Sequence, residues 1–389
     1  MTPSPLNPSC SRRSLLASAM LPFFAARAAG QPATGPKVLS IDTISRQPHL
    51  YHAWPTMIRR KSGELVAVYS GGREGHHCPF GRLEIIRSHD DGHTWSWPQV
   101  FMDTPIDDRD AGICETPRGT LLVTTFTAIG FEQYLANAKD WDPERIERWN
   151  AVMRTLSAEQ RKALVGKWML RSEDGGVTWT APYRVPATTP HGPVCLADGR
   201  LLYLGKNDNG AIGLYQSPDD GLSWRQVCEL PPRQGDQASL YHEPHLVEAA
   251  DGTLIAHLRN HNPANERETL QSESTDGGRT WSEPHPIGVW GLPSHLICLR
   301  DGRLLMTYGY RRMPRGNHAC LSTDHGRTWS PPIVISDDGT GDIGYPSTVE
   351  LPNGELLTLW YESKYSGSVP VKLPPPPYSV LRLARWKLA

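Results

Sequence analysis

Residues 88–95 read Ser-His-Asp-Asp-Gly-His-Thr-Trp, and the same pattern, Ser-x-Asp-x-Gly-x-Thr/Ser-Trp, recurs along the chain. We call this pattern the Asp box, and its five copies span residues 88–95, 172–179, 217–224, 274–281 and 322–329. The pattern suits a tight hairpin turn, in which the Asp side chain bonds backbone amides, Gly takes a positive φ and Trp packs between sheets. Five copies therefore predict a repeated β structure in which the box is structural and not catalytic.

A second repeated pattern, a glycine turn that leads into an apolar strand, occurs six times. It reads Gly-x-Leu followed by Leu, Val or Ile, with the glycines at positions 63, 119, 199, 252, 302 and 354. Each unit reads as four antiparallel strands with an Asp box before the last strand, except that the sixth unit has no box. Residues 38–389 are therefore predicted to be all-β, a six-bladed β-propeller of four-stranded antiparallel blades. We expect the segment from Val38 to Ile44 to pair with the last blade and close the ring.

One stretch, about residues 131–168, departs from the strand pattern. Glu, Arg, Ala and Trp at helical spacing replace the apolar alternation there. We expect a helical insertion in the second blade, with its charged residues on a solvated face.

The composition limits the partner. Lys and Arg number 40 and Asp and Glu 41, so the formal net charge is −1 and no basic field favours nucleic acid or an anionic membrane surface. We therefore expect a small or glycan ligand and no nucleic-acid partner.

Residues 1–30 differ in composition from the rest and resemble a twin-arginine export signal. The sequence Ser-Arg-Arg-Ser-Leu-Leu at positions 11–16 leads into an apolar run and then into small residues. The run is broken by Pro22 and is too short to span a bilayer comfortably, so no membrane span is expected. We predict cleavage near Ala28 or Ala29 and export to the periplasm or the cell exterior.

Of the seven cysteines, Cys10 lies in this segment, and the remaining even number invites disulfides in an exported protein. Cys114, Cys195 and Cys298, however, lie in apolar runs, where a free cysteine acts as a small buried hydrophobe. Twin-arginine substrates also usually fold before export. We therefore predict no disulfide framework, and we predict no metal site and no cofactor because no CxxC or HExxH pattern occurs.

Blade topology places two sets of loops on one face of the ring. Strand direction alternates, so the starts of the inner strands share a face with the connections from second to third strand, and the Asp boxes lie opposite. The inner-strand starts are residues 51–54, 108–110, 190–191, 241–243, 292–295 and 344–345. The second-to-third connections are residues 73–77, 206–208, 259–262, 310–312 and 361–362. Their ionisable side chains suit an anionic or heavily hydroxylated ligand.

From about Val38 to its C-terminus the chain resembles the sialidase superfamily, through its Asp boxes, its blades and these loops. The resemblance implies a Tyr nucleophile assisted by a Glu, an acid/base Asp and three Arg residues that bind the sugar carboxylate. It places the nucleophile at Tyr345, within Gly-Tyr-Pro-Ser at positions 344–347, and the assisting residue at Glu243. A Tyr attacks as a neutral phenol that an anionic sugar does not repel, while the Glu removes its proton.

The resemblance also places carboxylate-binding arginines at Arg259 and Arg311, with Arg312 or Arg315 as alternates for the second, and an arginine-orienting residue at Glu362. Guanidinium groups bind a carboxylate in a planar two-point geometry that Lys cannot copy. Further substrate-binding candidates on the same face are Arg73, His52, Trp54, Arg109, His191 and His295.

Two positions depart from the sialidase pattern. The first carboxylate-binding Arg should precede an apolar-Pro pair, but Ala53 precedes that pair here. The loop that should carry the acid Asp reads Arg-Glu-Gly-His-His-Cys-Pro at 73–79, so Glu74, His76 or Asp110 is expected to supply the acid. Such an acid must hold its proton near the working pH, as a partly buried Glu or a His does.

We therefore hypothesise a retaining exo-glycosidase that removes a terminal acidic sugar, sialic acid or a related ulosonic acid, from a glycan. Two alternatives stay open. The same fold, with Ala53 in place of Arg, suits a glycosidase or lyase that acts on a neutral or uronic sugar. A non-catalytic glycan-binding propeller, which has lost the carboxylate-binding arginine and the acid, would bind glycans without turnover.

Overall fold

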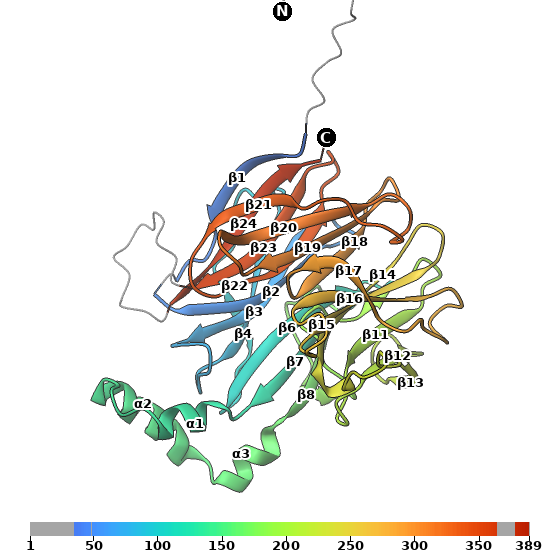
Figure 1. Ribbon diagram of the computed structural model, residues 1–389. Helices are drawn as coiled ribbons and strands as arrows, with labels where there is room; N and C mark the ends of the chain where they lie inside the picture. Colours follow the sequence, from blue (N-terminus) through green and yellow to red (C-terminus); the bar gives the residue numbers. More distant parts are fainter. Residues whose placement is uncertain (1–34, 48, 364–377, 389) are drawn as a thin grey trace, which may run out of the picture. The chain divides into compact units, whose positions relative to one another are not determined.

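A computed structural model describes residues 35–47, 49–363 and 378–388 (Figure 1). The expected export signal at residues 1–30 lies outside this range. Within residues 36–389 the described strands form six four-stranded antiparallel sheets, which confirms the six-bladed β-propeller expected from the repeats. The glycine turns are as expected: Gly63 and Gly302 have φ angles of +94° and +87°, which favour glycine.

Blades 1 to 3 follow one another in chain order. Blade 1 comprises β2 (Tyr51–Arg59), β3 (Leu65–Arg73), β4 (Arg82–Ser88) and β5 (Gln99–Met102). Blade 2 comprises β6 (Asp107–Glu115), β7 (Leu121–Ala128), β8 (Gly166–Ser172) and β9 (Tyr183–Arg184). Blade 3 comprises β10 (Val194–Cys195), β11 (Leu201–Lys206), β12 (Ile212–Ser217) and β13 (Arg225–Glu229).

Blades 4 to 6 complete the ring. After the 3₁₀ turn η1 (Ala238–Leu240), blade 4 comprises β14 (Tyr241–Glu248), β15 (Leu254–Asn260), β16 (Glu268–Ser274) and β17 (His285–Trp290). Blade 5 comprises β18 (Ser294–Cys298), β19 (Leu304–Tyr310), β20 (Arg315–Ser322) and β21 (Ile333–Gly339). Blade 6 comprises β22 (Ile343–Glu350), β23 (Leu356–Ser363), β24 (Ser379–Lys387) and β1 (Lys37–Thr43).

The outermost strand of blade 6 comes from the other end of the described chain. Strand β1 pairs antiparallel with β24, with Ile41 opposite Ala384, and completes a sheet in the order β1-β24-β23-β22. The expectation that the segment from Val38 to Ile44 closes the ring is confirmed. Because β1 leads along the chain to blade 1, its pairing with β24 ties the first blade to the last and covers the free edge of β24.

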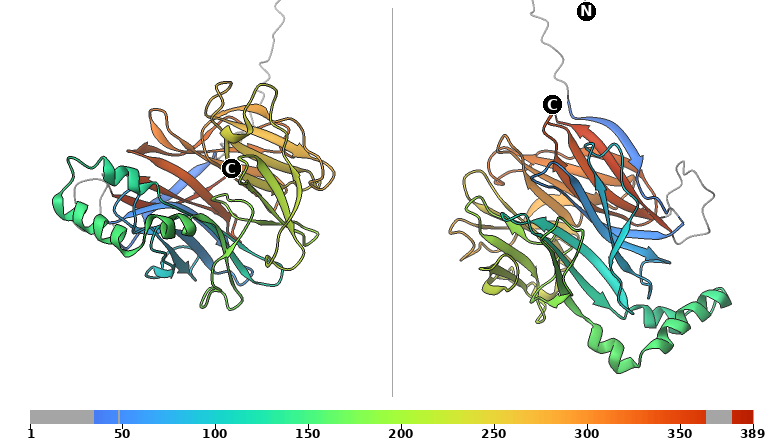
Figure 2. Two further views of the ribbon diagram at one scale, coloured as in Figure 1. Left: turned by 90° about the horizontal axis from the view of Figure 1, so that it is seen from below. Right: turned by 180° about the vertical axis from the view of Figure 1, so that it is seen from behind.

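The helical insertion lies between β7 and β8, inside blade 2, as expected (Figures 1 and 2). Trp168 already pairs with Thr125 of β7, so the insertion ends before residue 168, the end expected from the sequence. The Asp142 side chain caps α2 by accepting from the Glu144 amide. The helices are α1 (Phe131–Ala136), α2 (Pro143–Thr155) and α3 (Ala158–Leu164).

The hydrophobic clusters join adjacent blades. Leu65 of β3 packs with Leu357 of β23, and Trp95 of the first Asp box belongs to the same cluster. Because neighbouring blades cover both faces of a sheet, seven consecutive residues of β3 are buried. The core therefore lies between the blades, as the placement of the box tryptophans predicts.

Each Asp box satisfies the backbone of its own turn, as its fourth copy illustrates. The Ser274 hydroxyl donates to Asp276 Oδ1 at 2.8 Å and accepts from the Gly278 amide at 2.9 Å. Asp276 Oδ1 also accepts from the Thr280 amide at 2.9 Å. The box thus fixes the turn between the third and fourth strands of blade 4.

Removal of one buried box hydroxyl tests this structural role. In Ser274→Ala the buried Gly278 amide loses its acceptor, which is expected to lower the unfolding free energy by about 1–3 kcal/mol. Urea unfolding measures the change, and Ser239→Ala, at an exposed serine, is the matched control. An unchanged unfolding midpoint in Ser274→Ala would contradict the stabilising role of the box.

Candidate active site

Four inner strands hold a non-glycine residue in the left-handed region near their start. These residues are Trp54, Asp110, Glu243 and Tyr345, with φ angles of +54°, +50°, +44° and +53°. Each lies at a register shift of its strand, where the ladder of hydrogen bonds is interrupted. Such conformations cost of the order of 1–3 kcal/mol each and cluster at functional sites. The four positions therefore mark the candidate site.

Tyr345 and Glu243 form a hydrogen-bonded group with Arg259. The Tyr345 hydroxyl donates to Glu243 Oε1 at 2.6 Å. Arg259, on β15, donates from one guanidinium nitrogen to Glu243 Oε2 at 2.6 Å and to the Tyr345 hydroxyl at 3.1 Å. The structure thus brings together three residues that the sequence assigned to the site, from blades 4 and 6.

The charge states of this group are a neutral phenol and an ionised carboxylate. Burial opposes the ionisation of Glu243, but Arg259 and the Tyr345 hydroxyl outweigh it and hold the pKa of Glu243 below its usual value. Burial and the charge of Glu243 raise the pKa of Tyr345 well above its usual value. At neutral pH the phenol therefore keeps its proton and donates a hydrogen bond to an ionised Glu243 carboxylate.

Two cavities lie beside this group, and Arg267 and Arg311 line both. The smaller cavity has a volume of about 140 Å³ and is lined by Arg259, His261, Arg267, Trp290, Leu292, Gly309 and Arg311. The larger has a volume of about 630 Å³ and is lined by Tyr51, His76, Arg267, Arg311, Arg315, Gly341, Asp342 and Ser363. Because the described lining of the smaller cavity includes three arginines and no carboxylate, that cavity suits an anionic group.

Asp110 has a proton affinity that suits acid catalysis near neutral pH. Its side chain is buried, and Oδ1 has no hydrogen-bond partner among the described residues. Burial raises its pKa to about 7, with Arg109 opposing the shift and Glu243 adding to it. The charge of Asp110 also raises the pKa of Tyr345, so the two side chains lie within electrostatic range of each other.

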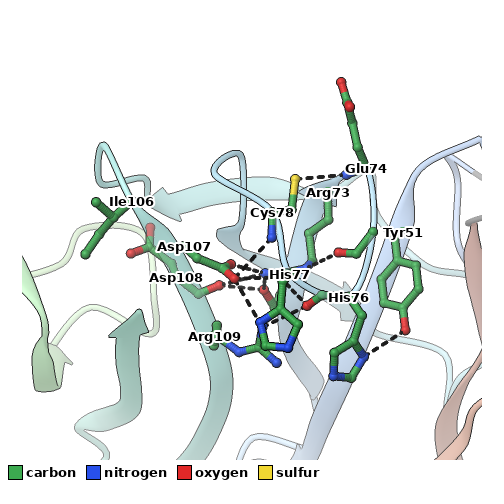
Figure 3. Close-up of polar contacts among 12 residues, drawn as sticks. Tyr51, Arg73, Glu74, His76, His77, Cys78, Ile106, Asp107, Asp108 and Arg109 are labelled. Carbon is green, nitrogen blue, oxygen red and sulfur yellow. Dashed lines mark hydrogen bonds and ion pairs between the residues drawn. The ribbon is translucent and has the colours of Figure 1, made fainter. Parts of the chain in front are cut away.

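Glu74 lies elsewhere. Figure 3 shows it directed away from Arg73 and the residues around it. Its carboxylate contacts helix α2, with Arg145 at 3.2 Å, Arg148 at 3.0 Å and the Trp149 indole nitrogen at 3.0 Å. These contacts hold the carboxylate at the helical insertion, and Glu74 lines neither of the two cavities. The structure therefore does not favour Glu74 as the acid expected from the sequence.

His76 lines the larger cavity with a neutral ring. Its Nδ1 lies 3.2 Å from the Tyr51 hydroxyl, and 3.7 Å from Asp342 Oδ2 (Figure 3 shows the Tyr51 contact). Burial and the positive charge of Arg109 lower the pKa of His76 to about 3. The ring is therefore neutral at pH 7 and suits hydrogen bonding to a sugar more than acid catalysis.

Arg73 and Arg109 are engaged by Asp107. Arg73 is fully buried and binds the two Asp107 carboxylate oxygens at 2.5 and 3.0 Å. Arg109 also donates to Asp107, at 3.1 Å, and its guanidinium carbon lies 4.2 Å from the Trp54 ring centroid. Neither arginine lines the two cavities, so the structure does not bear out a substrate contact for them, while Trp54 packs edge-on to Tyr345.

Two of the expected arginine positions differ in their access to the cavities. Arg312 is exposed and stacks on Trp290, with its guanidinium carbon 4.0 Å from the ring centroid. Arg315 lines the larger cavity and donates to the Gly341 carbonyl at 2.5 Å. Arg311, which lines both cavities, is therefore the blade 5 arginine that the geometry selects.

Glu362 and His52 have structural contacts. Glu362 is buried and binds Arg382 at 3.0 Å, so the arginine that it orients is Arg382 and neither Arg259 nor Arg311. His52 is buried with its Nδ1 2.9 Å from the Ser379 carbonyl, and it lines neither of the two cavities.

His191 and His295 do not face these cavities but form a buried cluster with His245. The ring centroids of His191 and His245 are 4.5 Å apart, and those of His245 and His295 are 4.6 Å apart. All three line a separate cavity of about 970 Å³ formed by later residues of the inner strands. The structure therefore places His191 and His295, two expected substrate-binding residues, in the lining of this third cavity and not in that of the two cavities near Tyr345.

This cluster does not fit a metal ion, although its nitrogens lie within 4.8 Å of one another. The Leu296 amide donates to His245 Nδ1 at 2.8 Å, and the Thr348 amide donates to His295 Nδ1 at 3.3 Å. A neutral ring that accepts at Nδ1 carries its hydrogen on Nε2, which then offers no lone pair to a metal.

The sequence reasoning missed Arg267 and Asp342. Arg267 lines both cavities, and Asp342 Oδ1 lies 3.3 Å from a guanidinium nitrogen of Arg311. Arg267 ends the connection of which only residues 259–262 were considered, and Asp342 lies three residues before Tyr345. The full second-to-third connection of blade 4 includes Arg267, whereas Asp342 directly precedes the inner strand of blade 6 and lies in none of the second-to-third connections.

Comparisons with known proteins agree with this architecture. Residues 147–357 match the family model described as a BNR repeat-like domain. A xyloglucanase from a Paenibacillus species is 28% identical over 163 residues, which cover 36% of this chain and 15% of that protein. The chain thus spans less than a fifth of the length of the curated relatives that it matches.

Two solved structures share the fold. A protein of unknown function from Dyadobacter fermentans aligns with a TM-score of 0.72 and 23% identity, over 92% of this chain and 100% of that one. The NanB sialidase from Streptococcus pneumoniae aligns with a TM-score of 0.61 and 16% identity, over 90% of this chain and 70% of that one. The sialidase-type propeller expected from the sequence is confirmed. No helix in the described ranges is both long and apolar enough to cross a membrane.

The histidine cluster predicts a loss of stability in acid. Burial lowers the pKa of His191 to about 3 and the pKa values of His245 and His295 well below the usual value. Unfolding returns the histidine pKa values to about 6.5. Below that pH the unfolded chain therefore binds more protons than the folded protein, so the unfolding free energy falls as the pH drops from about 6.5 towards 3. His191→Leu should lose less melting temperature between pH 7 and pH 4.5 than wild type.

Differential scanning fluorimetry across this pH range measures the effect. His93→Leu, at an exposed histidine, is the control and should follow the wild-type pH dependence. Equal losses in wild type and His191→Leu would contradict a contribution of the cluster to acid sensitivity.

Proposed function

Because the chain belongs to the BNR repeat-like domain family, we propose that it is a retaining exo-glycosidase that releases a terminal acidic sugar, sialic acid or a related ulosonic acid, from a glycan. One observation carries the proposal: the Tyr345 hydroxyl is bonded to Glu243 and Arg259, and Arg259 lines the small cavity with two further arginines. This arrangement supports the proposal, because a phenol hydrogen-bonded to a carboxylate adjoins a cavity lined by three guanidinium groups.

In the first step the Tyr345 oxygen attacks the anomeric carbon while its proton passes to Glu243. The bond from the anomeric carbon to the leaving oxygen breaks, and that oxygen takes a proton from Asp110. Arg259 contacts both partners of the transfer and stabilises the negative charge that they share. The product of this step is a glycosyl-tyrosine intermediate and the released aglycone.

In the second step the Asp110 carboxylate takes a proton from water, whose oxygen attacks the anomeric carbon. The bond to Tyr345 breaks, and the phenol oxygen recovers its proton from Glu243. Two displacements on the same carbon retain the anomeric configuration. A pKa of about 7 lets Asp110 exchange a proton in both directions near neutral pH.

A specific observation favours a second candidate function on the same fold. Ala53 occupies the position where the sialidase pattern has its first arginine, and the xyloglucanase similarity concerns proteins named for a neutral glycan. A glycosidase for a neutral or uronic sugar is therefore the alternative, and a non-catalytic glycan-binding propeller is the third. The export-like segment at residues 1–30 supports action in the periplasm or outside the cell.

Replacement of the nucleophile tests the mechanism. Tyr345→Phe removes the attacking oxygen and should lower kcat/KM on an aryl α-sialoside by about 10³-fold or more, equivalent to about 4 kcal/mol of transition-state stabilisation. Initial-rate kinetics measure the loss, and Tyr134→Phe, at a half-exposed tyrosine on α1, is the matched control.

Full activity of Tyr345→Phe would disprove the mechanism. Wild-type turnover of neutral or uronic aryl glycosides, with none of the sialoside, would favour the second candidate. Glycan binding without any turnover would favour the non-catalytic alternative.

The acid is tested by its dependence on the leaving group. Asp110→Asn cannot protonate the leaving oxygen, so kcat/KM on a natural sialyl-oligosaccharide should fall by about 10²–10⁴-fold. An aryl glycoside with a nitrophenolate leaving group needs little protonation and should lose much less. In wild type, kcat/KM on the oligosaccharide should decline above about pH 7, where the Asp110 proton is lost.

Rates on both substrates across pH 5–9 measure these effects. Asp140→Asn, at an exposed carboxylate before α2, is the control. An equal loss of rate on both substrates would identify Asp110 as a residue that shapes the site without acting as its acid.

A further inference from the structure

We infer that Arg267 supplies the third arm of the subsite for the acidic group of the substrate, the arm that blade 1 lacks. The inference rests on the proposed function, because it concerns how the same site holds an anionic sugar. We use the name arginine clamp for the side chains of Arg259, Arg267 and Arg311.

The first support is that all three arginines line one small space. The cavity of about 140 Å³ has Arg259, Arg267 and Arg311 in its wall together with Trp290 and Leu292. His261 and Gly309 complete the lining, and His261 Nε2 accepts from Arg259 at 2.8 Å, so the described lining holds three guanidinium groups and no carboxylate. A carboxylate would satisfy the guanidinium donors that remain. Arg259 also donates to Tyr345, so this space adjoins the proposed nucleophile.

The second support is that the backbone of Arg267 is held in place. Its φ angle is +65°, a strained value for a non-glycine residue. Its amide donates to the Asn260 carbonyl at 2.9 Å, and its carbonyl accepts from the Gly291 amide at 3.2 Å. The buried Asn260 side chain donates to the carbonyls of Ala264 and Asn265 at 2.8 and 2.9 Å, which fixes the loop that leads to Arg267.

The third support is that the Arg267 guanidinium is available to a ligand. The Arg259 guanidinium already donates hydrogen bonds to Glu243, Tyr345 and His261. Arg311 donates to the Ile343 carbonyl and forms an ion pair with Asp342. Arg267, in contrast, has as its ion-pair partner in the described structure only the neighbouring Glu266, at 3.5 Å, and its side chain is 59% exposed. Of the three arginines it has the most donors to offer.

Blade 1 has no arginine to fill this role. Ala53 is completely buried, and the two arginines expected on this face in blades 1 and 2, Arg73 and Arg109, are bound by Asp107. A third guanidinium must therefore come from another direction, and Arg267 approaches from the second-to-third connection of blade 4. The carboxylate would then be held from the side of blades 4 and 5.

The group bound by the arginine clamp is present in both the free substrate and the transition state. Loss of one arm should therefore weaken binding more than it slows the chemical step. Arg267→Ala is expected to weaken binding of an acidic sugar by about 10–100-fold, as for the loss of a charge-assisted hydrogen bond, and to leave kcat within a few-fold of wild type. Because the side chain is exposed, the substitution should not disturb folding.

The experiment measures binding of N-acetylneuraminic acid and of its methyl ester by isothermal titration calorimetry. Wild type should prefer the acid to the ester, and Arg267→Ala should lose most of that preference while binding the ester as before. Arg267→Lys should recover part of the acid affinity, because Lys keeps the charge but not the two-point geometry. Arg279→Ala, at an exposed Asp-box arginine, is the control and should bind like wild type.

Asn260→Ala separates position from charge. It keeps the Arg267 guanidinium but removes the two hydrogen bonds that fix its loop, so it should raise the Kd for the acid and leave kcat on an aryl sialoside nearly unchanged. Its melting curve checks that the protein is folded.

The outcomes distinguish a failure of the proposed function from a failure of the role of Arg267. If wild type binds the acid no more tightly than the ester, both the acidic substrate class and the clamp are wrong. If wild type prefers the acid and Arg267→Ala keeps the full preference, the role of Arg267 is wrong while the proposed function stands.

Discussion

The left-handed residue near the start of four inner strands is the constraint on which the site depends. At Glu243 and Tyr345 it interrupts the strand, and two residues later the chain bonds to the next blade. His245 accepts from the Leu296 amide at 2.8 Å, and the Ser347 hydroxyl accepts from the Met57 amide at 2.9 Å. These contacts between blades offset the strain, so one local distortion both positions the reactive side chain and joins neighbouring sheets.

The same arrangement separates the proton affinities of two buried carboxyl groups. Glu243 has a guanidinium directly on its carboxylate, so its pKa stays low despite burial. Asp110 is equally enclosed, but the nearby Arg109 is drawn to Asp107 and only partly offsets burial, so its pKa rises to about 7. Two carboxyl groups in one site thus differ in charge at neutral pH, which is what a base and an acid in the same reaction need.

The repeats were sufficient to predict the fold, because each Asp box and each glycine turn determines the structure of its own hairpin. The six glycine turns then define six blades, which close into a ring. Tyr345, Glu243 and Arg259 were predictable because strand order places their positions on one face and the sialidase resemblance singles out these three residues there. Glu74 was not, because the direction of its side chain depends on arginines of α2, an insertion with no counterpart in the repeat. The positions of His191 and His295 were not predictable, because a strand start identifies a face only to within one or two residues, and both side chains line the cavity of about 970 Å³ instead.

Aromatic and cationic side chains already surround the position of Ala53, where the sialidase pattern has an arginine. The lack of an arginine at this one position does not by itself remove the ability to bind an anionic ligand. The Trp54 ring next to it is covered by Arg109 and met edge-on by His76, at 5.1 Å between ring centroids, so blade 1 is filled with aromatic and cationic groups that face one another. A ring of six similar blades has other loops that reach the same centre. The electric field in a small cavity depends on the number of guanidinium groups and on their distance, and not on whether a strand or a loop carries them. A loop arginine on a fixed backbone can therefore restore a positive charge that a strand position no longer provides.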